Sequence, residues 1–324
     1  SISENLDVVI DTTAPTVSEA VAVTTPSNDT TPSFTINSNE AGTITSSKTI
    51  DTGGTASSGD NVVTLVALVA GSYTPTATVT DASGNETTIT LTTFVIDTTS
   101  PAAFQSTTVA STGGTAVSTY YNSTNTAVSV TTPIASNDAT LVGGTLRIQA
   151  KVGANGTFVD RGNEAAITVA GDQVVSISAS DVEGLVGFDE GVVLYFRAVI
   201  TDSAGNATTG TASATTLTVD QAAPSVSAFS MNDTSLITGD TATVTLTFSE
   251  AVTGFNSDDD ITEQSGTLGT MTSADETAWT GTFTPSPNTS DSSNILSLAT
   301  TYTDVAGNPG PTATTANYVV DTAA

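Results

Sequence analysis

The chain has 324 residues, with 33 acidic side chains against five basic ones, a net charge of −28, and neither histidine nor cysteine. So few cations cannot follow a phosphate backbone, which excludes nucleic acid, and anionic membranes repel the negative charge. Without histidine, cysteine or a Gly-x-Ser-x-Gly motif, the chain lacks disulfides, thiolate or imidazole metal sites and the usual catalytic nucleophiles and bases, so we expect no enzyme.

The expected elements, taken in chain order, are β-strands, because apolar and polar residues alternate with period two and no sustained helical periodicity occurs. Residues 6–10 resemble the end of a last strand. Strands are expected over residues 33–37, 73–79 and 88–95, and Pro75 implies an edge or a bulge in the second of these. No apolar run approaches the length of a membrane span, and no signal peptide opens the chain.

The second half of the chain shows the same alternation. Residues 146–152 and 193–199 read as strands, and residues 242–248 form the cleanest period-two run. A longer hairpin is expected around residues 153–156 and a longer crossover around residues 181–191. Period-two strands with one solvated face are typical of antiparallel sandwiches.

A six-residue phrase, Thr-Asp-x-x-Gly-Asn, occurs three times, at residues 80–85, 201–206 and 303–308. One strand's length after each copy stands an aspartate: Asp97, Asp220 and Asp321. Two of these open a proline-containing joint, and a similar joint stands near the start of the chain. The repetition indicates an array of units rather than a single globule.

The aspartates divide the chain into three units of the size of Ig-type sandwiches. We expect the last strand of a preceding repeat at 1–10, three domains at 11–96, 97–219 and 220–320, and a linker at 321–324. The domains are called units one, two and three below. The chain is therefore expected to be a fragment of a longer repeat protein, with neighbouring repeats of the same protein as its partners.

The joint at residues 11–15, the three Thr-Asp-x-x-Gly-Asn loops and the segment 248–254 together resemble bacterial Ig-like repeats. These repeats are similar to those of long surface adhesins, including repeats-in-toxin adhesins, and of some surface-layer proteins. The resemblance implies an all-β fold: three tandem Ig-like antiparallel β-sandwich domains in an extended rod. It also implies an extracellular, cell-surface location.

In the Ig-like strand order, three places meet at the N-terminal end of a unit: the incoming linker, the loop after the second strand and the loop before the last strand. Three carboxylates gathered there repel one another unless a cation lies among them, and hard oxygen ligands suit Ca²⁺. We therefore predict calcium at each joint, although the phrase is also an ordinary tight turn. The predicted ligands are Asp11, Glu40, Asp81 and Asn85 in unit one, Asp97, Asp138, Asp202 and Asn206 in unit two, and Asp220, Glu250, Asp304 and Asn308 in unit three.

The predicted function is that of a non-catalytic extender in a bacterial cell-surface adhesin, with calcium stiffening the joints between domains. One alternative is a segment of a calcium-dependent surface-layer lattice, in which the chains would self-associate laterally. A second alternative is a set of spacer domains in a large extracellular enzyme. Acidic pairs could serve a glycosidase, but such enzymes hold them in a deep cleft, which small sandwiches do not offer.

Overall fold

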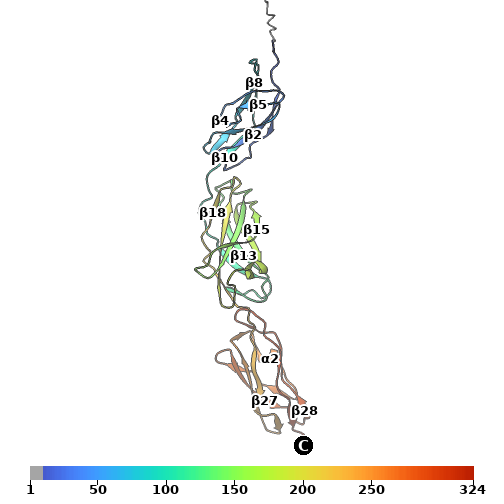
Figure 1. Ribbon diagram of the computed structural model, residues 1–324. Helices are drawn as coiled ribbons and strands as arrows, with labels where there is room; N and C mark the ends of the chain where they lie inside the picture. The colour runs from blue at the N-terminus through green and yellow to red at the C-terminus, as the bar shows by residue number, and fades with distance from the viewer. Residues whose placement is uncertain (1–9) are drawn as a thin grey trace, which may run out of the picture.

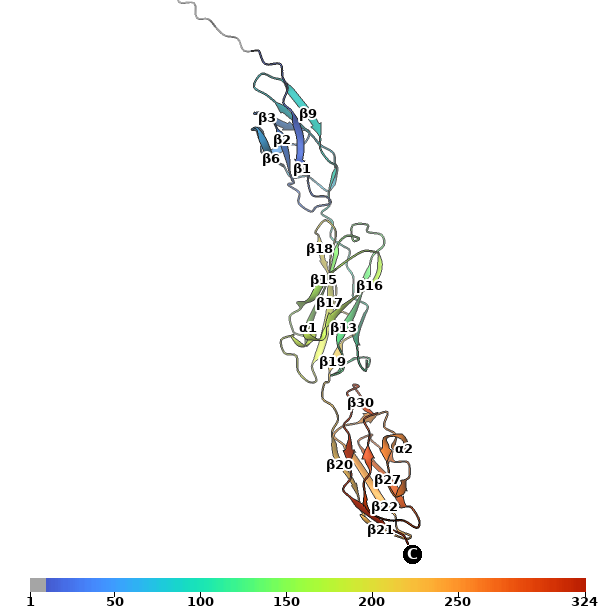
Figure 2. The same cartoon turned by 90° about the vertical axis from the view of Figure 1, so that its right-hand side faces the viewer.

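A computed structural model describes residues 10–324 of the protein (Figure 1). Three β-sandwiches follow one another end to end, so residue 10 and the C-terminus lie at opposite ends of a rod (Figures 1 and 2). The predicted tandem Ig-like fold is confirmed. The expected last strand of a preceding repeat lies outside the described residues, apart from Ile10, which is not in a strand. Within residues 10–324, no helix is long and apolar enough to cross a membrane.

Unit one consists of two four-stranded sheets and one further strand pair, in the orders β1-β2-β6-β4, β5-β3-β8-β9 and β10-β7. The strands are β1 (Val17–Val21), β2 (Ser33–Ser38), β3 (Gly42–Ser46), β4 (Ile50–Thr52), β5 (Thr55–Ala56), β6 (Gly59–Leu65), β7 (Gly71–Tyr73), β8 (Thr76–Thr80), β9 (Glu86–Thr90) and β10 (Phe94–Ile96). The strand predicted over 73–79 is broken between β7 and β8, because Pro75 has no N–H to donate to a ladder. The strand predicted over 88–95 is likewise divided into β9 and β10.

Unit two combines a three-stranded sheet, β11-β13-β16, with a six-stranded sheet in the order β12-β19-β17-β14-β15, to which β18 adds beside β17. Its elements are β11 (Thr108–Thr112), β12 (Tyr120–Tyr121), β13 (Ala127–Ile134), β14 (Thr145–Val152), β15 (Val159–Ala166), β16 (Gly171–Ser178), α1 (Ala179–Glu183), β17 (Val193–Thr201), β18 (Ala207–Thr209) and β19 (Leu217–Val219). The longer hairpin predicted near residue 153 joins β14 to β15, and the longer crossover runs from α1 to β17.

Unit three has a main sheet, β20-β22-β27-β25 with β26 beside β27, and three smaller groups, β21-β32-β28, β23-β30 and β24-β29-β31. The elements are β20 (Val226–Met231), β21 (Ser235–Ile237), β22 (Ala242–Phe248), β23 (Val252–Thr253), α2 (Ser257–Asp260), β24 (Ile261–Thr262), β25 (Gly266–Leu268), β26 (Thr272–Ser273), β27 (Ala278–Pro285), β28 (Ser290–Asn294), β29 (Ser297–Leu298), β30 (Thr303–Asp304), β31 (Ala313–Thr314) and β32 (Tyr318–Asp321). The clean alternation predicted at 242–248 is β22.

Each unit closes its own hydrophobic core between its sheets. In unit one, Phe34, Ile36 and Val63 alternate with more exposed neighbours along β2 and β6 and are at most 1% exposed. Units two and three have separate cores of the same kind, and the three cores share no residue. Burying one face of each strand is what stabilises each sandwich.

A short parallel pairing recurs at the C-terminal end of every unit, where a segment lies beside the last strand. Ser27 bridges Ile96 in unit one, β12 pairs with β19 in unit two, and β21 pairs with β32 in unit three. The residue opposite the aspartate at the end of the last strand (Asp97, Asp220 or Asp321) therefore lies at the tip of each unit. These tip residues are Asn28, Asn122 and Ile237.

Candidate metal centres at the ends of the units

The repeated Thr-Asp-x-x-Gly-Asn loop folds as a tight turn around its aspartate. In unit one, Asp81 Oδ1 accepts hydrogen bonds from Ser83 N at 2.8 Å and Asn85 N at 2.9 Å, and Gly84 has a φ of +91° that favours glycine. The second copy repeats these bonds, because Asp202 accepts from Ala204 N and Asn206 N at 2.9 Å each. In the third copy Asp304 accepts from Gly307 N at 2.7 Å, one residue further on, and from Asn308 N at 2.8 Å. The turn thus fixes the direction of each carboxylate.

The asparagine of each turn holds the incoming linker. Its amide nitrogen donates both to the turn aspartate and to a backbone carbonyl of the linker: Asn85 to Asp11 O at 3.2 Å, Asn206 to Asp97 O at 2.9 Å, and Asn308 to Asp220 O at 2.9 Å. A donating amide nitrogen cannot coordinate a cation. The linker is therefore attached to the loop without any ion, a role that the sequence reading did not give to these residues.

Asn308, a predicted metal ligand, also contacts unit two through its side-chain oxygen. Its Oδ1 accepts two hydrogen bonds from Ser123 of unit two, from N at 2.8 Å and from Oγ at 2.6 Å, which occupy both lone pairs. For Asn85, Asn206 and Asn308 a ligand role stays a prediction.

In unit one the structure brings together the three predicted carboxylates. Asp11 comes from the linker, Glu40 from the loop between β2 and β3, and Asp81 from the turn between β8 and β9, and their nearest oxygens all lie within 4.8 Å of one another. Asp81 is buried, Glu40 is half-buried and Asp11 is exposed. The amide of Asn85 donates to Asp81 and holds the pKa of that carboxyl below its usual value. Asp81 therefore contributes a negative charge to the group at neutral pH.

In unit three the same three positions converge. Asp220, Glu250 and Asp304 present carboxylate oxygens within 4.8 Å of one another, and Asp304 is buried. Burial, followed by repulsion from Asp304, raises the pKa of both Asp220 and Glu250. A raised pKa with repulsion among its causes marks a group of anions that the chain itself does not neutralise.

A fourth carboxylate, which sequence reasoning missed, reaches the unit three group from unit two. Glu190 lies in the crossover before β17, and its charge contributes to the raised pKa of both Asp220 and Glu250. Its Oε2 also accepts a hydrogen bond from the linker residue Gln221 N at 3.0 Å. The repeated phrase carries no signal for Glu190, because this crossover is an insertion found in unit two alone.

In unit two the predicted ligands do not form an equivalent group. Among residues 10–324 only the two groups above bring three acidic side chains this close, so Asp97, Asp138 and Asp202 are not brought together in the same way. Asp138 Oδ1 accepts from Thr140 N at 3.0 Å and from its Oγ1 at 2.5 Å, so the carboxylate caps its own loop.

Loop length explains this difference between the units. Glu40 stands in a three-residue loop after the second strand, and so does Glu250, whereas Asp138 stands in the ten-residue loop between β13 and β14. A long loop does not fix the direction of the side chain toward the linker. Asp97 and Asp138 nevertheless line one shallow hollow at this end of unit two.

Direct contacts join the units at these same loops. At the joint between units one and two, Asn28 N donates to Ala204 O at 2.9 Å. At the joint between units two and three, Asn122 Nδ2 donates to Ala306 O at 2.6 Å, in addition to the two bonds from Ser123. Ala204 and Ala306 occupy the same position in the repeated phrase. In both joints the backbone carbonyl at this position therefore accepts a hydrogen bond from the preceding unit.

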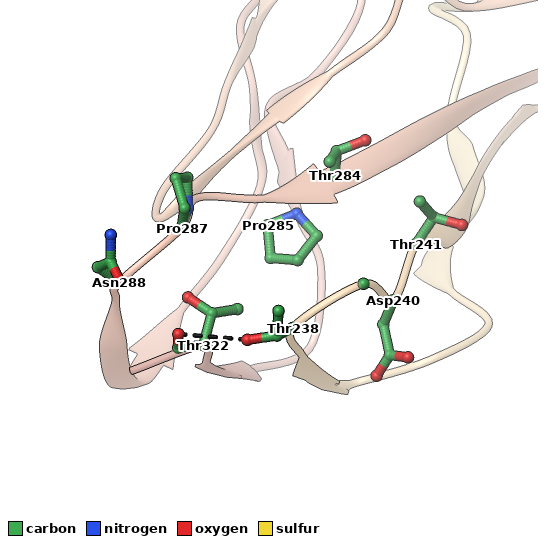
Figure 3. Close-up of a pocket in the computed structure, with 9 residues that line it drawn as sticks. Thr238, Asp240, Thr241, Thr284, Pro285, Pro287, Asn288 and Thr322 are labelled. Atoms are coloured by element: carbon green, nitrogen blue, oxygen red, sulfur yellow. Dashed lines mark hydrogen bonds between the residues drawn. The ribbon is translucent and has the colours of Figure 1, made fainter. Parts of the chain in front are cut away.

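The C-terminal tip of unit three is built differently. Figure 3 shows the hollow there, where Thr238 Oγ1 donates to Thr322 O at 3.3 Å beside Pro285 and Asp240. Ile237 takes the place of the tip asparagines and is 57% exposed, and its N–H donates to Asp240 Oδ2. This tip thus lacks the amide with which unit two contacts unit three.

Comparison with known proteins supports the fold. Residues 220–320, which form unit three, match the family described as the bacterial Ig-like domain. No curated protein matches the sequence.

Three solved structures are similar to the chain at low sequence identity. FdeC, an adhesin of Escherichia coli, is 13% identical with a TM-score of 0.35, over 94% of this chain and 96% of that one. The FN1–FN3 domains of chicken CNTN1 are 11% identical with a TM-score of 0.29, over 95% of this chain and 98% of that one. A membrane-anchored protein of Corynebacterium diphtheriae is 11% identical with a TM-score of 0.26, over 96% and 95%.

Proposed function

We propose that the chain is a non-catalytic extender of a bacterial cell-surface adhesin, and that Ca²⁺ stiffens its joints. The observation that carries this proposal is the convergence of linker and loop carboxylates at the N-terminal ends of units one and three in a rod of sandwiches. The bacterial Ig-like match of unit three supports an extracellular location on a bacterium.

The chemistry of the donor sets fits a hard divalent cation. Asp11, Glu40 and Asp81 would hold one ion, and Asp220, Glu250 and Asp304 would hold a second, with backbone carbonyls and water completing the shell. Because one carboxylate of each set belongs to the linker, bound calcium would add a charge-based link to the bonds that the asparagines make. Two sites per chain are proposed, not the three that the repeated phrase suggested.

Glu190 gives the second site a particular role. It belongs to unit two but faces the carboxylates at the start of unit three. A cation there is attracted by both units at once, so it opposes their separation. Without the cation, four anions repel one another across the joint, and the angle between the units becomes more variable.

Calcium titration calorimetry on the whole chain tests the proposal. We expect about two ions per chain. Glu250→Gln should remove one of them, whereas the matched control Asp138→Asn, which also removes one negative charge, should keep both.

Chelation should lower the melting temperature and broaden the distance distribution from small-angle X-ray scattering. Unchanged melting and scattering on chelation would show that calcium does not stiffen this rod.

The two alternatives of the sequence reading have distinct signatures. A surface-layer segment forms calcium-dependent two-dimensional arrays visible by electron microscopy, whereas an extender forms no such arrays. A spacer in a large enzyme requires a catalytic domain on the same polypeptide. A rod is compatible with the adhesin, surface-layer and enzyme-spacer roles alike. The adhesin role is preferred because end-to-end sandwiches with hydrogen-bonded linkers can hold a distal module away from a surface.

A further inference from the structure

The few cations of this acidic chain are gathered on unit two. Four of the five basic residues, Arg147, Lys151, Arg161 and Arg197, lie on β14, β15 and β17 of one sheet. Unit three, by contrast, has twelve acidic residues and no basic one. The sheet therefore has a charge unlike the rest of the rod.

On the outer surface of this sheet the cations stack on aromatic rings. The Arg197 guanidinium carbon lies 4.1 Å from the centroid of the Phe158 ring, and Lys151 Nζ lies 4.8 Å from the same centroid and 5.2 Å from that of Tyr195. These four residues are called the cationic face below. Cation–π contacts hold the side chains in place while leaving their charge uncompensated.

The acidic side chains on the same sheet pair with Arg147, which is not part of the cationic face. Arg147 pairs with Glu164 at 3.0 Å and with Asp160 at 3.7 Å, and these are the two ion pairs found among residues 10–324. Arg197 Nε instead donates to the neutral Gln149 at 2.7 Å. In a chain with 33 acidic residues, the cations of the cationic face thus have no carboxylate of their own.

A pocket continues the cationic face around the edge of the sheet. It lies between the β14–β15 hairpin and the loop after α1, the two insertions that lengthen unit two. Lys151 and Arg161 line it, together with Val152, Gly156, Thr157, Val159, Leu185 and Val186. No acidic residue lines it, and Val186 is 95% exposed. Arg161 forms no ion pair with a carboxylate either: its Nη2 donates to Gly184 O at 3.0 Å, and its buried Nε has no acceptor.

We propose that the cationic face and this pocket bind the acidic surface of unit three in a second copy of the chain. Charge complementarity supplies the argument, because each copy carries one sheet with unpaired cations and one unit with only acidic charge. The exposed valines beside the pocket give the contact an apolar part that is buried on association. Two copies that lie side by side and parallel would be displaced along the rod by one unit.

Salt dependence and matched variants test the association. Sedimentation velocity should show dimers or larger species at about 0.1 M salt and monomers at about 1 M, where the Debye length falls from about 10 Å to about 3 Å. Arg197→Glu should weaken association about tenfold or more. Lys48→Glu, on unit one, makes the same change in net charge and should have little effect. Circular dichroism checks that both variants are folded.

Zero-length cross-linking locates the partner surface. A carbodiimide joins lysine amines to carboxylates, and the chain has two lysines, Lys48 and Lys151. In a mixture of light and isotope-labelled chains, Lys151 should form mixed-label links to residues 220–320, and Lys48 should not. A protein that stays monomeric at every concentration overturns the proposal. So does equal weakening by the two variants, or binding of poly-glutamate without self-association.

Discussion

The two joints of this rod use the same loop and differ in how firmly they are held. Between units one and two, one backbone hydrogen bond crosses from Asn28 to the loop. Between units two and three, Asn122 and Ser123 donate three bonds to the loop, and Glu190 adds a contact to the linker. The repeated phrase is the acceptor in both joints, so the difference comes from the preceding unit.

This comparison shows that the loop at the start of each unit can stay the same while the tip of the preceding unit varies. Asn28 is exposed and uses its main-chain N–H, whereas Asn122 is fully buried and uses its side-chain amide. The second joint also has the carboxylate group that the first lacks. We therefore expect the stiffness of each joint to depend on the contacts that the preceding unit makes there.

The largest expected effect concerns the turn of the second joint. Asp304→Ala removes a carboxylate that accepts from Gly307 N, Asn308 N and Asn308 Nδ2. Leaving these buried donors unpaired should lower the free energy of unfolding of unit three by about 2–3 kcal/mol, net of the repulsion that is relieved. The melting temperature should fall by roughly 10–20 °C. Measuring in chelator separates this loss from that of an ion, and Val305→Ala, at an exposed position of the same turn, is the control.

A smaller effect is expected from replacing the tip asparagines, and it should differ between Asn122 and Asn28. Asn122→Ala removes the amide bonded to Ala306 O and should cost the second joint about 1–2 kcal/mol. It also removes the bonds of this side chain to Thr115 and Thr124, which stabilise the loop within unit two. Asn28→Ala keeps the backbone donor and should leave the first joint as it is. Because the chain has no cysteine, spin labels can be placed at introduced cysteines on adjacent units. A broadened distance distribution is expected for Asn122→Ala alone, and equal broadening in both variants would contradict the comparison.

The smallest expected effect is a dependence on pH that differs between the two groups. Asp220 and Glu250 have raised pKa values in the folded chain, so the folded state binds more protons than the unfolded one. In chelator, their contribution to stability should fall as the pH rises above about 4, the usual range of these carboxyls. Asp81 has a lowered pKa, so its contribution should be lost as the pH falls below that range.

Melting curves of the chain between about pH 3 and pH 7 check these signs. Asp220→Asn should reduce the loss of stability of unit three with rising pH, and saturating calcium should also suppress this loss. If the stability of unit three rises with pH in chelator, the repulsion inferred for the second joint is not significant.

The sequence predicted the fold and the convergence of two groups of carboxylates, and local chemistry explains why. The period-two runs at β2, β14, β17 and β22 are visible in the residues, because one face of each strand is buried. The groups at Asp11 and Asp220 were predictable because short loops leave Glu40 and Glu250 little freedom. The same argument failed at Asp138, where a ten-residue loop lets the carboxylate cap its own backbone.

Other parts of the joints could not be read from one sequence. Asn122, Ser123 and Glu190 stand outside the repeated phrase, and they reach it only because tertiary packing brings the end of unit two to the start of unit three. The asparagines of the phrase were predicted as ligands, since an amide offers an oxygen as readily as a nitrogen. Which atom faces the linker depends on the hydrogen bonds around it.

The parallel pairing beside each last strand has a mechanical consequence. A pull along the rod acts roughly along this strand pair, so its hydrogen bonds are loaded together in shear instead of opening one after another. The pairing extends over three residues in unit three and two in unit two, and it is a single bridge in unit one. Under tension, unit one should therefore extend first and act as the compliant segment of the rod.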